Sequence, residues 1–433
     1  MFVIPEQAHY CPGKFLEMGC KVLQAKVERY KTVSANSTTE VCNMFRISRM
    51  QEILKGLPRG NFDAVVREHQ ADKYRKNFSC WDQLVAMVYA QLSGASSLRQ
   101  LEAGYNSQRT HHYHLGTGEL RRSTLADANA KRPPQVFAQV AQGLMAQAKR
   151  SLRQEGWQLL CLLDSTSITL KGRGFDGWTM ETSTRNTQGI KLHMLYGAHE
   201  QAPLSCEFSP ANVNDVEPGS RIALERNAMY VFDKGYCNYN WWASFDAAGA
   251  WFVTRFKSNA ALRELEVMPI PPEARAVILA DHRVCFKNRH PRGGRRNDYT
   301  APLRRIVIAR QGHDTPLILA TNDLDTPALE IARHYKDRWQ IELFFKWIKQ
   351  HLGIKSFLGR SENAVRIQIL VALIAYLLLA LYRRAHGLKG SMWTLLAELR
   401  ATLFQRPTAE SAAYRRRQER ERAFAQCQPG LFA

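Results

Sequence analysis

The sequence predicts an α/β fold, with helical regions before and after the core and a β-rich insertion within it. Two nearly continuous apolar runs, "QLLCLLDST" and "AMYVFDKGY", each lead into an aspartate, Asp164 and Asp233. This pattern is typical of strands buried on both faces. Residues 257–325 alternate short β-like runs with a Gly/Arg-rich loop, whereas residues 44–150 and 326–405 have the apolar periodicity of helices.

The first 43 residues show little periodicity. We expect residues 1–43 to be disordered, or to be a translated upstream extension with the natural start at Met44 or Met50. Residues 44–150 are expected to form a small helical domain with a basic surface.

Two helices of this domain have recognisable start signals. Ser79 is a candidate N-cap with Asp82 three residues later, and Gly94 is a candidate stop. A second helix is expected to begin after Ser123 or Thr124.

Residues 151–256 read as the first part of the α/β core. After the run that leads into Asp164, "GIKLHMLYG" and "LSCEFSP" are expected to be two strands joined by a short turn. The run that leads into Asp233 is followed by an expected helix, "NYNWWASFDAAG", and an expected strand, "WFVTRF". Because α/β sheets place function at the carboxyl ends of their strands, both aspartates are candidate site residues.

The insertion, residues 257–325, is expected to contain the strands "AVILA", "HRVCF", "RRIVIAR" and "PLILATN". Its loop "KNRHPRGGRR" is the densest basic loop and a candidate for phosphate contact. Arg255 and Lys257 stand where the insertion leaves the core, and DNA contact and a solvated surface role are equally consistent with them. The candidates in the loop are Arg292, Arg295 and Arg296.

A long amphipathic helix opens the region 326–405, with Thr326 as the expected N-cap, Pro327 at the first position and Gly353 as the stop. At 3.6 residues per turn, four polar side chains fall within an arc of about 60°: Tyr335, Arg338, Glu342 and Lys349. The neighbouring arc is apolar, so Glu342 should lie at the edge of a core between cations. Further apolar helices are expected to follow, and residues 406–433 are expected to be a charged, solvated tail.

Composition points to an acidic partner. The 433 residues include 60 Lys and Arg against 39 Asp and Glu, a formal charge of +21. Such an excess favours a polyanion, most often nucleic acid, although a basic protein that is merely soluble remains an alternative.

The nine cysteines show no CxxC pair and no zinc-site spacing, which indicates reduced thiols in a cytoplasmic protein. The first residues have no secretory pattern. The apolar stretch "IQILVALIAYLLLALY" favours a buried helix over a transmembrane one, because it is short and contains Gln368.

Two strand-end aspartates and one helix-face glutamate are the oxygen ligands that hold Mg²⁺ or Mn²⁺. A pair of such ions can clamp the attacking and leaving oxygens of a phosphodiester. Each acid alone has a simpler interpretation: a strand-end Asp often caps a loop, and a Glu beside Arg often forms a solvated i,i+4 pair. The order strand-Asp, strand-Asp, helix-Glu, with a basic stripe on the same helix, favours the metal site.

The run "YKDRWQIELFFKWIK" resembles the Y-x2-R-x3-E-x6-K signature of the insertion-sequence-4 family of bacterial transposases. "LLDST", "GIKLH" and "VFDKGY" are similar to that family's segments at and between its two aspartates, and the resemblance extends over roughly residues 60–385. It implies an RNase H-like catalytic core interrupted by the β-rich insertion. It also implies a metal-binding catalytic triad, which would be Asp164, Asp233 and Glu342.

The resemblance further implies cleavage at the ends of a transposon, followed by attack of the freed 3′-hydroxyl on DNA. Tyr335, Arg338 and Lys349 would hold phosphates of the double-stranded end, and the working form would be at least a homodimer on DNA in the bacterial cytoplasm, associated with the nucleoid. Hairpin-forming relatives stack a base on a tryptophan in the insertion. Residues 257–325 contain no Trp, and Tyr299 or Phe286 are the candidate replacements.

Two alternatives remain open on sequence alone. One is a metal-dependent RNase H-like nuclease without strand transfer, and the other is a DNA-binding remnant without catalysis. The presence of all three acids argues against the second.

Overall fold

A computed structural model describes residues 48–153, 158–287, 296–310, 312, 314–354 and 356–405. Glu52–Leu403 forms one compact unit, which contains all the elements discussed below apart from the start of α2. The expectations for residues 1–43 and for the tail 406–433 lie outside the described residues.

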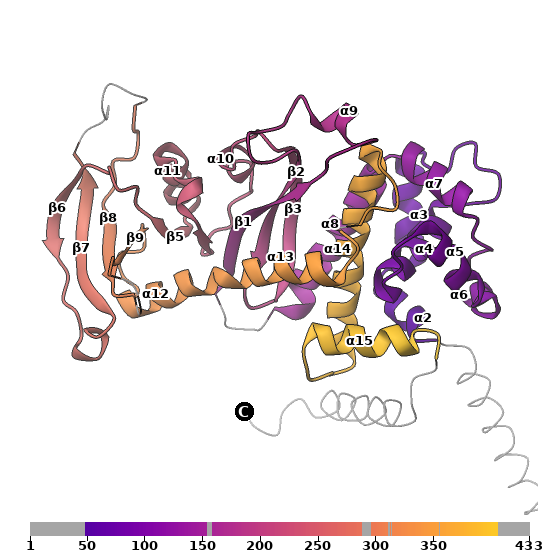
Figure 1. Cartoon of the computed structure of the whole chain (residues 1–433). Coiled ribbons are helices and arrows are strands. Elements are labelled where there is room, and N and C mark those ends of the chain that lie inside the picture. Colours follow the sequence, from indigo (N-terminus) through magenta and orange to yellow (C-terminus); the bar gives the residue numbers. More distant parts are fainter. Residues whose placement is uncertain are drawn as a thin grey trace, which may run out of the picture. The chain divides into compact units, whose positions relative to one another are not determined.

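The described part of the chain begins with a helical region before the first strand (Figure 1). Ser79 and Asp82 form the expected capping box at the start of α4, and Gly94 ends that helix with φ +76°. The expected cap at Ser123 or Thr124 is wrong, because the helix begins earlier, at Arg122, and its N-cap residue has no capping side chain. Two prolines, Pro133 and Pro134, then separate α7 from α8. The helices of this region are α2 (Arg49–Leu54), α3 (Arg59–Glu68), α4 (Cys80–Ser93), α5 (Leu98–Asn106), α6 (His112–Leu115), α7 (Arg122–Lys131) and α8 (Gln135–Leu152).

The core is a mixed sheet with the strand order β3-β2-β1-β4-β5 followed by β9-β8-β7-β6. Strands β1, β2 and β3 pair antiparallel, whereas β1, β4 and β5 pair parallel, which is the arrangement of an RNase H-like core. The expected α/β class and RNase H-like core are confirmed. The five core strands are β1 (Leu160–Thr169), β2 (Gly189–Gly197), β3 (Ala202–Pro210), β4 (Met229–Phe232) and β5 (Trp251–Arg255).

Strand β1 differs from expectation because it does not end at Asp164. It pairs with β4 only from Leu160 to Leu163, and its pairing with β2 continues to Thr169 opposite Gly189. Gly189 has φ +145°, and a Cβ there would lie 2.1 Å from the carbonyl oxygen of Ile168, so only glycine fits this close approach. Asp164 therefore lies inside a long strand, at the end of its parallel pairing.

The segment between β5 and the long helix adds four antiparallel strands to the same sheet, because β9 pairs with β5. The expected strands "AVILA" and "HRVCF" are one strand, β7. Strand β6, "LRELEV", was not predicted, since half of its side chains are charged and all but the first are exposed. The strands are β6 (Leu262–Val267), β7 (Ile278–Phe286), β8 (Leu303–Ile308) and β9 (Leu317–Thr321).

The long helix is present as two segments, α12 (Ala328–Asp337) and α13 (Trp339–His351), which run end to end (Figure 1). They are separated at Arg338, which keeps helical dihedral angles of φ −49° and ψ −30°. The expected cap at Thr326 is wrong by one residue: Pro327 is the N-cap, and the Thr326 N–H instead donates to Asp323. The expected apolar face is buried, at Ile341, Phe344, Phe345, Ile348 and Leu352.

Helix α11 (Tyr239–Ala248) covers one face of the core sheet, where Trp241 and Trp242 join an aromatic cluster. Helix α12 packs against β4, β5 and β7, and α13 packs against β1. Two helices follow, α14 (Glu362–Ala385) and α15 (Met392–Thr402).

Helix α14 is long and apolar enough to cross a membrane, but 94% of its most apolar window is buried inside the protein. It packs against α4, α7, α8 and β3. The sequence favoured a buried helix over a transmembrane one for this segment, and the burial of α14 confirms that prediction.

Candidate active site

The register of β1 and β4 places two aspartates side by side. The last paired residues of these parallel strands are Leu163 and Phe232, and Asp164 and Asp233 follow them directly. Leu163 and Phe232 both belong to the aromatic cluster beneath α11. Because successive side chains in an extended chain alternate between faces, the two aspartates belong to the other face, where α12 and α13 pack.

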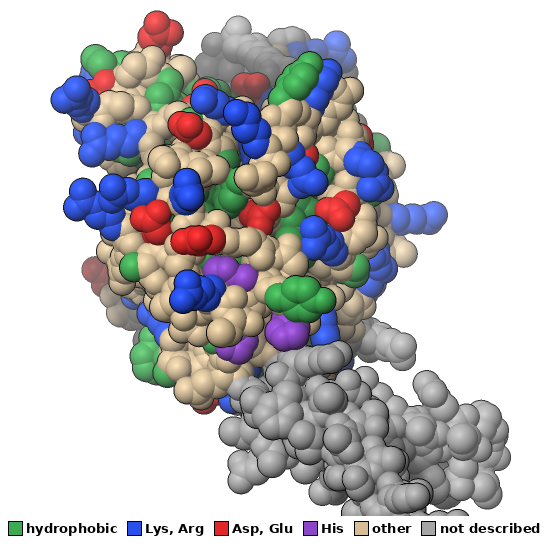
Figure 2. Space-filling view, turned by 90° about the vertical axis from the view of Figure 1, so that its right-hand side faces the viewer, with side chains coloured by type: hydrophobic (Ala, Val, Ile, Leu, Met, Phe, Trp, Pro, Cys, Tyr) green, Lys and Arg blue, Asp and Glu red, His purple; other side chains and the backbone are tan. Residues whose placement is uncertain are grey.

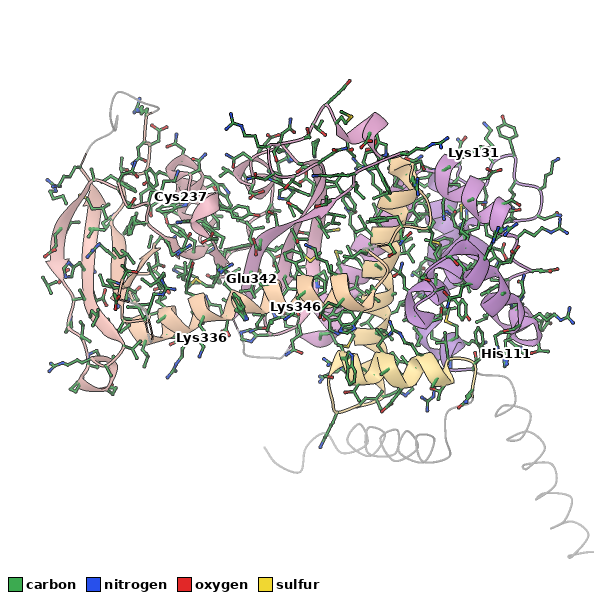
Figure 3. The ribbon with its side chains drawn as sticks, viewed as in Figure 1. His111, Lys131, Cys237, Lys336, Glu342 and Lys346 are labelled. Carbon is green, nitrogen blue, oxygen red and sulfur yellow. The ribbon has the colours of Figure 1, made fainter. Side chains whose placement is uncertain are left out.

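Glu342 reaches this face from the first turn of α13. Figure 3 shows it on the side of the helix toward the sheet, whereas Lys336 of α12 points away. The Arg338 guanidinium lies between two of the acids: its Nη2 is 2.6 Å from Glu342 Oε1, and its Nη1 is 3.7 Å from Asp164 Oδ2. Arg338 thus joins the helix acid to the strand acid, and it also forms the i,i+4 pair that the simpler sequence interpretation predicted.

Asp164 has the most perturbed carboxyl group of the three. Its pKa is raised from 3.8 to about 6: burial is the largest cause and the nearby charges of Glu342 and Asp233 add to it, against the opposing effects of the Ser165 N–H and Arg338. The Ser165 N–H donates to Asp164 Oδ1 at 2.8 Å. Asp164 therefore interacts with both other acids, and an added cation among them would relieve the repulsion.

Asp233 is held by a different cation. Arg255 Nη2 donates to Asp233 Oδ1 at 2.6 Å. Burial alone would raise the pKa of Asp233, but the bonds from Arg255 and from the backbone N–H of Lys234 outweigh it, so the pKa lies below its usual value. Arg255, the last residue of β5, was a candidate DNA contact on sequence. In the structure it is bonded to the second aspartate.

The three acids provide the right donor chemistry for a hard divalent cation, since all are carboxylates whose side chains are only 21–34% exposed. Among the residues that the structure describes, no three His, Cys, Asp or Glu side chains come close enough together to hold one ion. The guanidinium groups of Arg338 and Arg255 stand beside the acids instead. The three carboxylates are therefore the type of ligand that a divalent cation prefers. In this structure they are paired with arginines.

The remaining stripe residues also face the protein. Lys349 Nζ donates to Thr166 Oγ1 and, at 3.1 Å, to the Ser167 carbonyl, both on the part of β1 beyond Asp164. The Arg338 guanidinium lies 5.8 Å from the centre of the Tyr335 ring. Burial raises the pKa of Tyr335, so its hydroxyl stays protonated and able to donate a hydrogen bond.

Lys257 and Arg296 line one hollow of about 770 Å³ beside the carboxyl ends of β4 and β5. Asn240 fixes the segment of Arg296, because its Nδ2 donates to the Arg296 carbonyl at 3.0 Å. Sequence reasoning missed Asn238 and Asn240, which also line the hollow, although "CNYNW" directly follows the second-aspartate motif. Arg292 and Arg295 lie outside the described residues.

The aromatic replacements considered for a missing tryptophan are not available for stacking. Tyr299 is only 4% exposed. The Phe286 ring packs against Tyr239, with 4.3 Å between the ring centres. Both belong to or contact the core cluster, so that expectation is corrected.

Residues 158–378 match the family described as Transposase DDE domain, a span that includes Asp164, Asp233 and Glu342. The chain belongs to the DDE transposase family. DDE transposases are enzymes that depend on divalent metal ions and act on DNA. Residues 46–118 of this transposase match a second family, described as Domain of unknown function (DUF4372).

The transposase is 44% identical over 262 residues to the putative transposase y4zB of Sinorhizobium fredii, a match covering 60% of this chain and 71% of the relative. It is 28% identical over 233 residues to a probable transposase for the insertion sequence element IS5377 of Geobacillus stearothermophilus, covering 54% and 58%. It is 24% identical over 280 residues to a putative transposase for the element IS4SA of Synechocystis, covering 60% and 71%.

Among solved structures, a piggyBac transposase synaptic complex with hairpin DNA resembles the chain at 11% identity and a TM-score of 0.42, covering 90% of this chain and 81% of the other. A similarity this low carries no argument about fold or function.

Proposed function

We propose that this DDE transposase mobilises an insertion sequence: it binds the terminal inverted repeats, cleaves DNA at the transposon ends and joins the freed 3′-hydroxyl to a target. The observation that carries the proposal is the register of β1 and β4, which sets Asp164 beside Asp233 on the face reached by Glu342 of α13. The names of two relatives, both transposases for insertion sequence elements, support it.

In this proposal Asp164, Asp233 and Glu342 hold Mg²⁺ or Mn²⁺. When bound, the ions supply an activated water and charge stabilisation for phosphodiester displacement. The raised pKa of Asp164, caused first by burial and then by the charges of Glu342 and Asp233, is the protein's own contribution, because a cation among these acids would stabilise their charged forms. Arg338 and Arg255 then serve as internal counter-charges that keep the acids oriented before DNA and metal are bound.

The phosphates of the transposon end would be held on both sides of the acids. Lys349 and Arg338 offer cations and Tyr335 offers a hydroxyl on the helix side. Lys257 and Arg296 offer two more cations at the hollow beside β4 and β5. Arg255, Arg292 and Arg295 complete the proposed DNA contacts. A DNA phosphate would then replace Asp233 as the anionic partner of the Arg255 guanidinium.

We also propose that the protein works as a homodimer on double-stranded DNA, since two ends must be joined, and in the bacterial cytoplasm with the nucleoid. Residues 44–150 would form the helical DNA-binding domain, residues 151–256 and 326–405 the two parts of the catalytic core, and residues 257–325 its insertion.

The Glu342→Gln variant tests the triad. We expect cleavage of an end-containing duplex in Mg²⁺ or Mn²⁺ to fall below detection, while binding of the same duplex in a chelator stays within about twofold. The matched control is Glu330→Gln, the same change at a more exposed position of α12. Retained cleavage by Glu342→Gln would remove the triad assignment.

A second assay separates a transposase from a nuclease. The wild-type chain is given a pre-cleaved end with a free 3′-hydroxyl, together with a supercoiled target. A joined product supports the proposed function, and hydrolysis without joining supports the alternative nuclease.

A further inference from the structure

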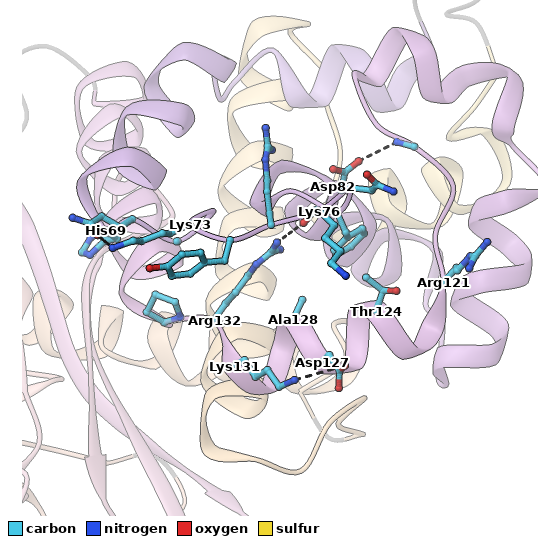
Figure 4. A pocket seen from close by; sticks show the side chains of 18 of the residues that line it. His69, Lys73, Lys76, Asp82, Arg121, Thr124, Asp127, Ala128, Lys131 and Arg132 are labelled. Atoms are coloured by element: carbon cyan, nitrogen blue, oxygen red, sulfur yellow. Dashed lines mark hydrogen bonds and ion pairs between the residues drawn. The ribbon is translucent and has the colours of Figure 1, made fainter.

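The helical region contains a hollow of about 750 Å³ that is remote in sequence from the three acids (Figure 4). It lies between the segment that follows α3, the turn before α7, and α7 itself. The hollow is outside the matched DDE domain, and its lining is rich in cations: Lys73, Arg75, Lys76, Arg121, Lys131 and Arg132.

The acids of the hollow do not neutralise all these cations. Asp82 accepts from the N–H groups of Ser79, at 2.8 Å, and Gly118, at 3.0 Å, so its carboxylate caps α4 and fixes the turn before α7. Asp127 lies 3.8 Å from Lys131 on the same helix face. Asp82 and Asp127 therefore already have partners, whereas Glu119, the third acid of the lining, is exposed.

Two of the arginines are structural. Arg75 Nη1 lies 3.1 Å from Asp72. Arg132 has a nearly buried side chain that donates to the Phe78 and Ser79 carbonyls and to Gln83. These bonds hold the segment between α3 and α4 against the end of α7.

Lys73, Lys76 and Arg121 are different, because within the described parts of the chain no carboxylate lies within ion-pair distance of any of them. Figure 4 shows Lys76 extending over the hollow, with Lys131 on α7 across from it and Arg121 at one end. Three unneutralised cations around one concave surface repel one another, so an anion there would be bound favourably.

Tyr74 adds an aromatic side chain to the same segment. It is 90% exposed, and its backbone has φ +65°, in the left-handed region that a bulky residue enters at a cost of about 1–2 kcal/mol. The Lys73 ammonium lies 5.3 Å from the centre of its ring. The exposed ring has little packing to offset the backbone strain, and strain held without packing is a feature of binding segments.

We propose that this hollow binds the phosphodiester backbone of duplex DNA, with Lys73, Lys76 and Arg121 contacting phosphates and Tyr74 packing against the strand. The proposal rests on the proposed function insofar as DNA is the polyanion that the protein handles. Charge complementarity selects the backbone: the free cations are spread around an open surface, as successive phosphates require, and are not gathered at one point. Figure 2 shows Lys and Arg side chains spread over one side of the molecule, with several Asp and Glu side chains among them.

The charge test uses the full chain and a triple variant, Lys73→Gln, Lys76→Gln and Arg121→Gln. Its matched control removes three exposed cations elsewhere in the helical region: Lys55→Gln, Arg99→Gln and Arg109→Gln. Binding of a labelled duplex is measured by anisotropy in a chelator over a range of salt concentrations. Each lost phosphate contact lowers the salt slope by about 0.9.

We expect the hollow variant to bind at least tenfold more weakly at moderate salt, with a slope smaller by roughly 2 to 3, and the control to stay within about twofold. Equal binding and equal slopes for the two triple variants would overturn the proposal. Competition by inorganic phosphate at millimolar concentration, without a difference in duplex binding, would assign the hollow to a small anion and also overturn it.

Tyr74 is tested by a substitution that separates folding from binding. Tyr74→Gly relieves the positive φ, so the chain should be at least as stable as the wild type while duplex binding weakens severalfold with an unchanged salt slope. The control is Tyr113→Ala, which removes another ring that is 87% exposed. If the Tyr74→Gly variant binds the duplex as tightly as the wild type, Tyr74 is not part of the proposed DNA-binding surface.

Metal binding tells this proposal apart from the proposed function. The hollow variant should keep the stabilisation that Mg²⁺ gives to the wild-type chain, because its substitutions lie far in sequence from the acids. Normal duplex binding by the hollow variant, together with loss of cleavage in Glu342→Gln, would refute the hollow and leave the triad standing. Weak duplex binding by the hollow variant, together with retained cleavage in Glu342→Gln, would support the hollow and refute the triad.

Discussion

Arg338 Nη2 lies 2.6 Å from Glu342 Oε1, one helical turn further along, and Arg338 is also the nearest cation to Asp164. The contact between Arg338 and Asp164 crosses from the junction of α12 and α13 to strand β1, so a single guanidinium connects two of the three proposed ligands. The side chains of Arg338, Asp164 and Glu342 are each at least two-thirds buried. Charge balance at the site therefore depends on Arg338 whenever no other cation is present.

Arg338→Ala should destabilise the metal-free chain by about 1–3 kcal/mol, because two partly buried carboxylates lose a partner. Added Mg²⁺ should then raise the melting temperature more in the variant than in the wild type, because no guanidinium competes for the acids. Thermal melts with and without Mg²⁺ measure both effects. The control, Arg366→Ala, breaks another i,i+4 Arg–Glu pair, on α14. An equal Mg²⁺ effect in wild type and Arg338→Ala would contradict the idea that Arg338 and the metal share the acids.

The raised pKa of Asp164 predicts a pH-dependent stability. Its folded-state pKa, about 6, lies above its usual 3.8, so folding opposes the charged form. Below both values the carboxyl is protonated in either state and there is no cost, whereas above both the folded chain bears the full cost. From about pH 4 to pH 7 the wild type should thus lose up to about 3 kcal/mol relative to Asp164→Asn, at 1.36 kcal/mol per unit.

Urea unfolding in a chelator, at several pH values across this window, measures the difference between the two chains. Comparing them cancels the opposite contribution of Asp233, which is present in both. Parallel stability curves would show that Asp164 titrates normally and that burial does not act on it as described.

The ion pair of Asp281 and Arg304 ties the added strands to the catalytic helix. Arg304 donates to both Asp281 oxygens, at 2.8 and 2.6 Å, with both residues buried, and also to the Thr326 carbonyl just before α12. Asp281→Ala should cost about 3–5 kcal/mol, since it leaves a buried charge unpaired. Chemical unfolding measures this cost.

Arg283→Ala is the matched control on the same strand, because the Arg283–Glu266 pair is largely exposed. It should cost less than about 1 kcal/mol. A cost for Asp281→Ala no larger than that of the control would show that the pair does not fix the start of α12.

The helix of the signature motif was predictable because its pattern is local. The apolar positions Ile341, Phe344 and Ile348 repeat at helical spacing, and each is buried. The strand runs before Asp164 and Asp233 were recognisable for the same reason, since strands buried on both faces are apolar throughout. Strand β6 escaped prediction because its exposed, charged side chains leave no such pattern.

The partners of the acids were beyond the reach of sequence. Arg255 was expected to contact DNA, yet it bonds to Asp233, 22 residues earlier in the chain. Lys349 reaches Thr166 and Ser167 across more than 180 residues. Such contacts depend on which strands pair and in which register, and no short segment records that.

The sequence alone determined that the chain carries two aspartates that follow apolar strand runs, a glutamate on an amphipathic helix and a large positive charge, because residue type and local periodicity need no neighbours. Only the tertiary structure decided that Asp164 and Asp233 stand at matching positions of β1 and β4, and that arginines lie between the acids. The physical reason is that strand pairing and burial bring distant segments together. The acids thereby acquire their charged neighbours.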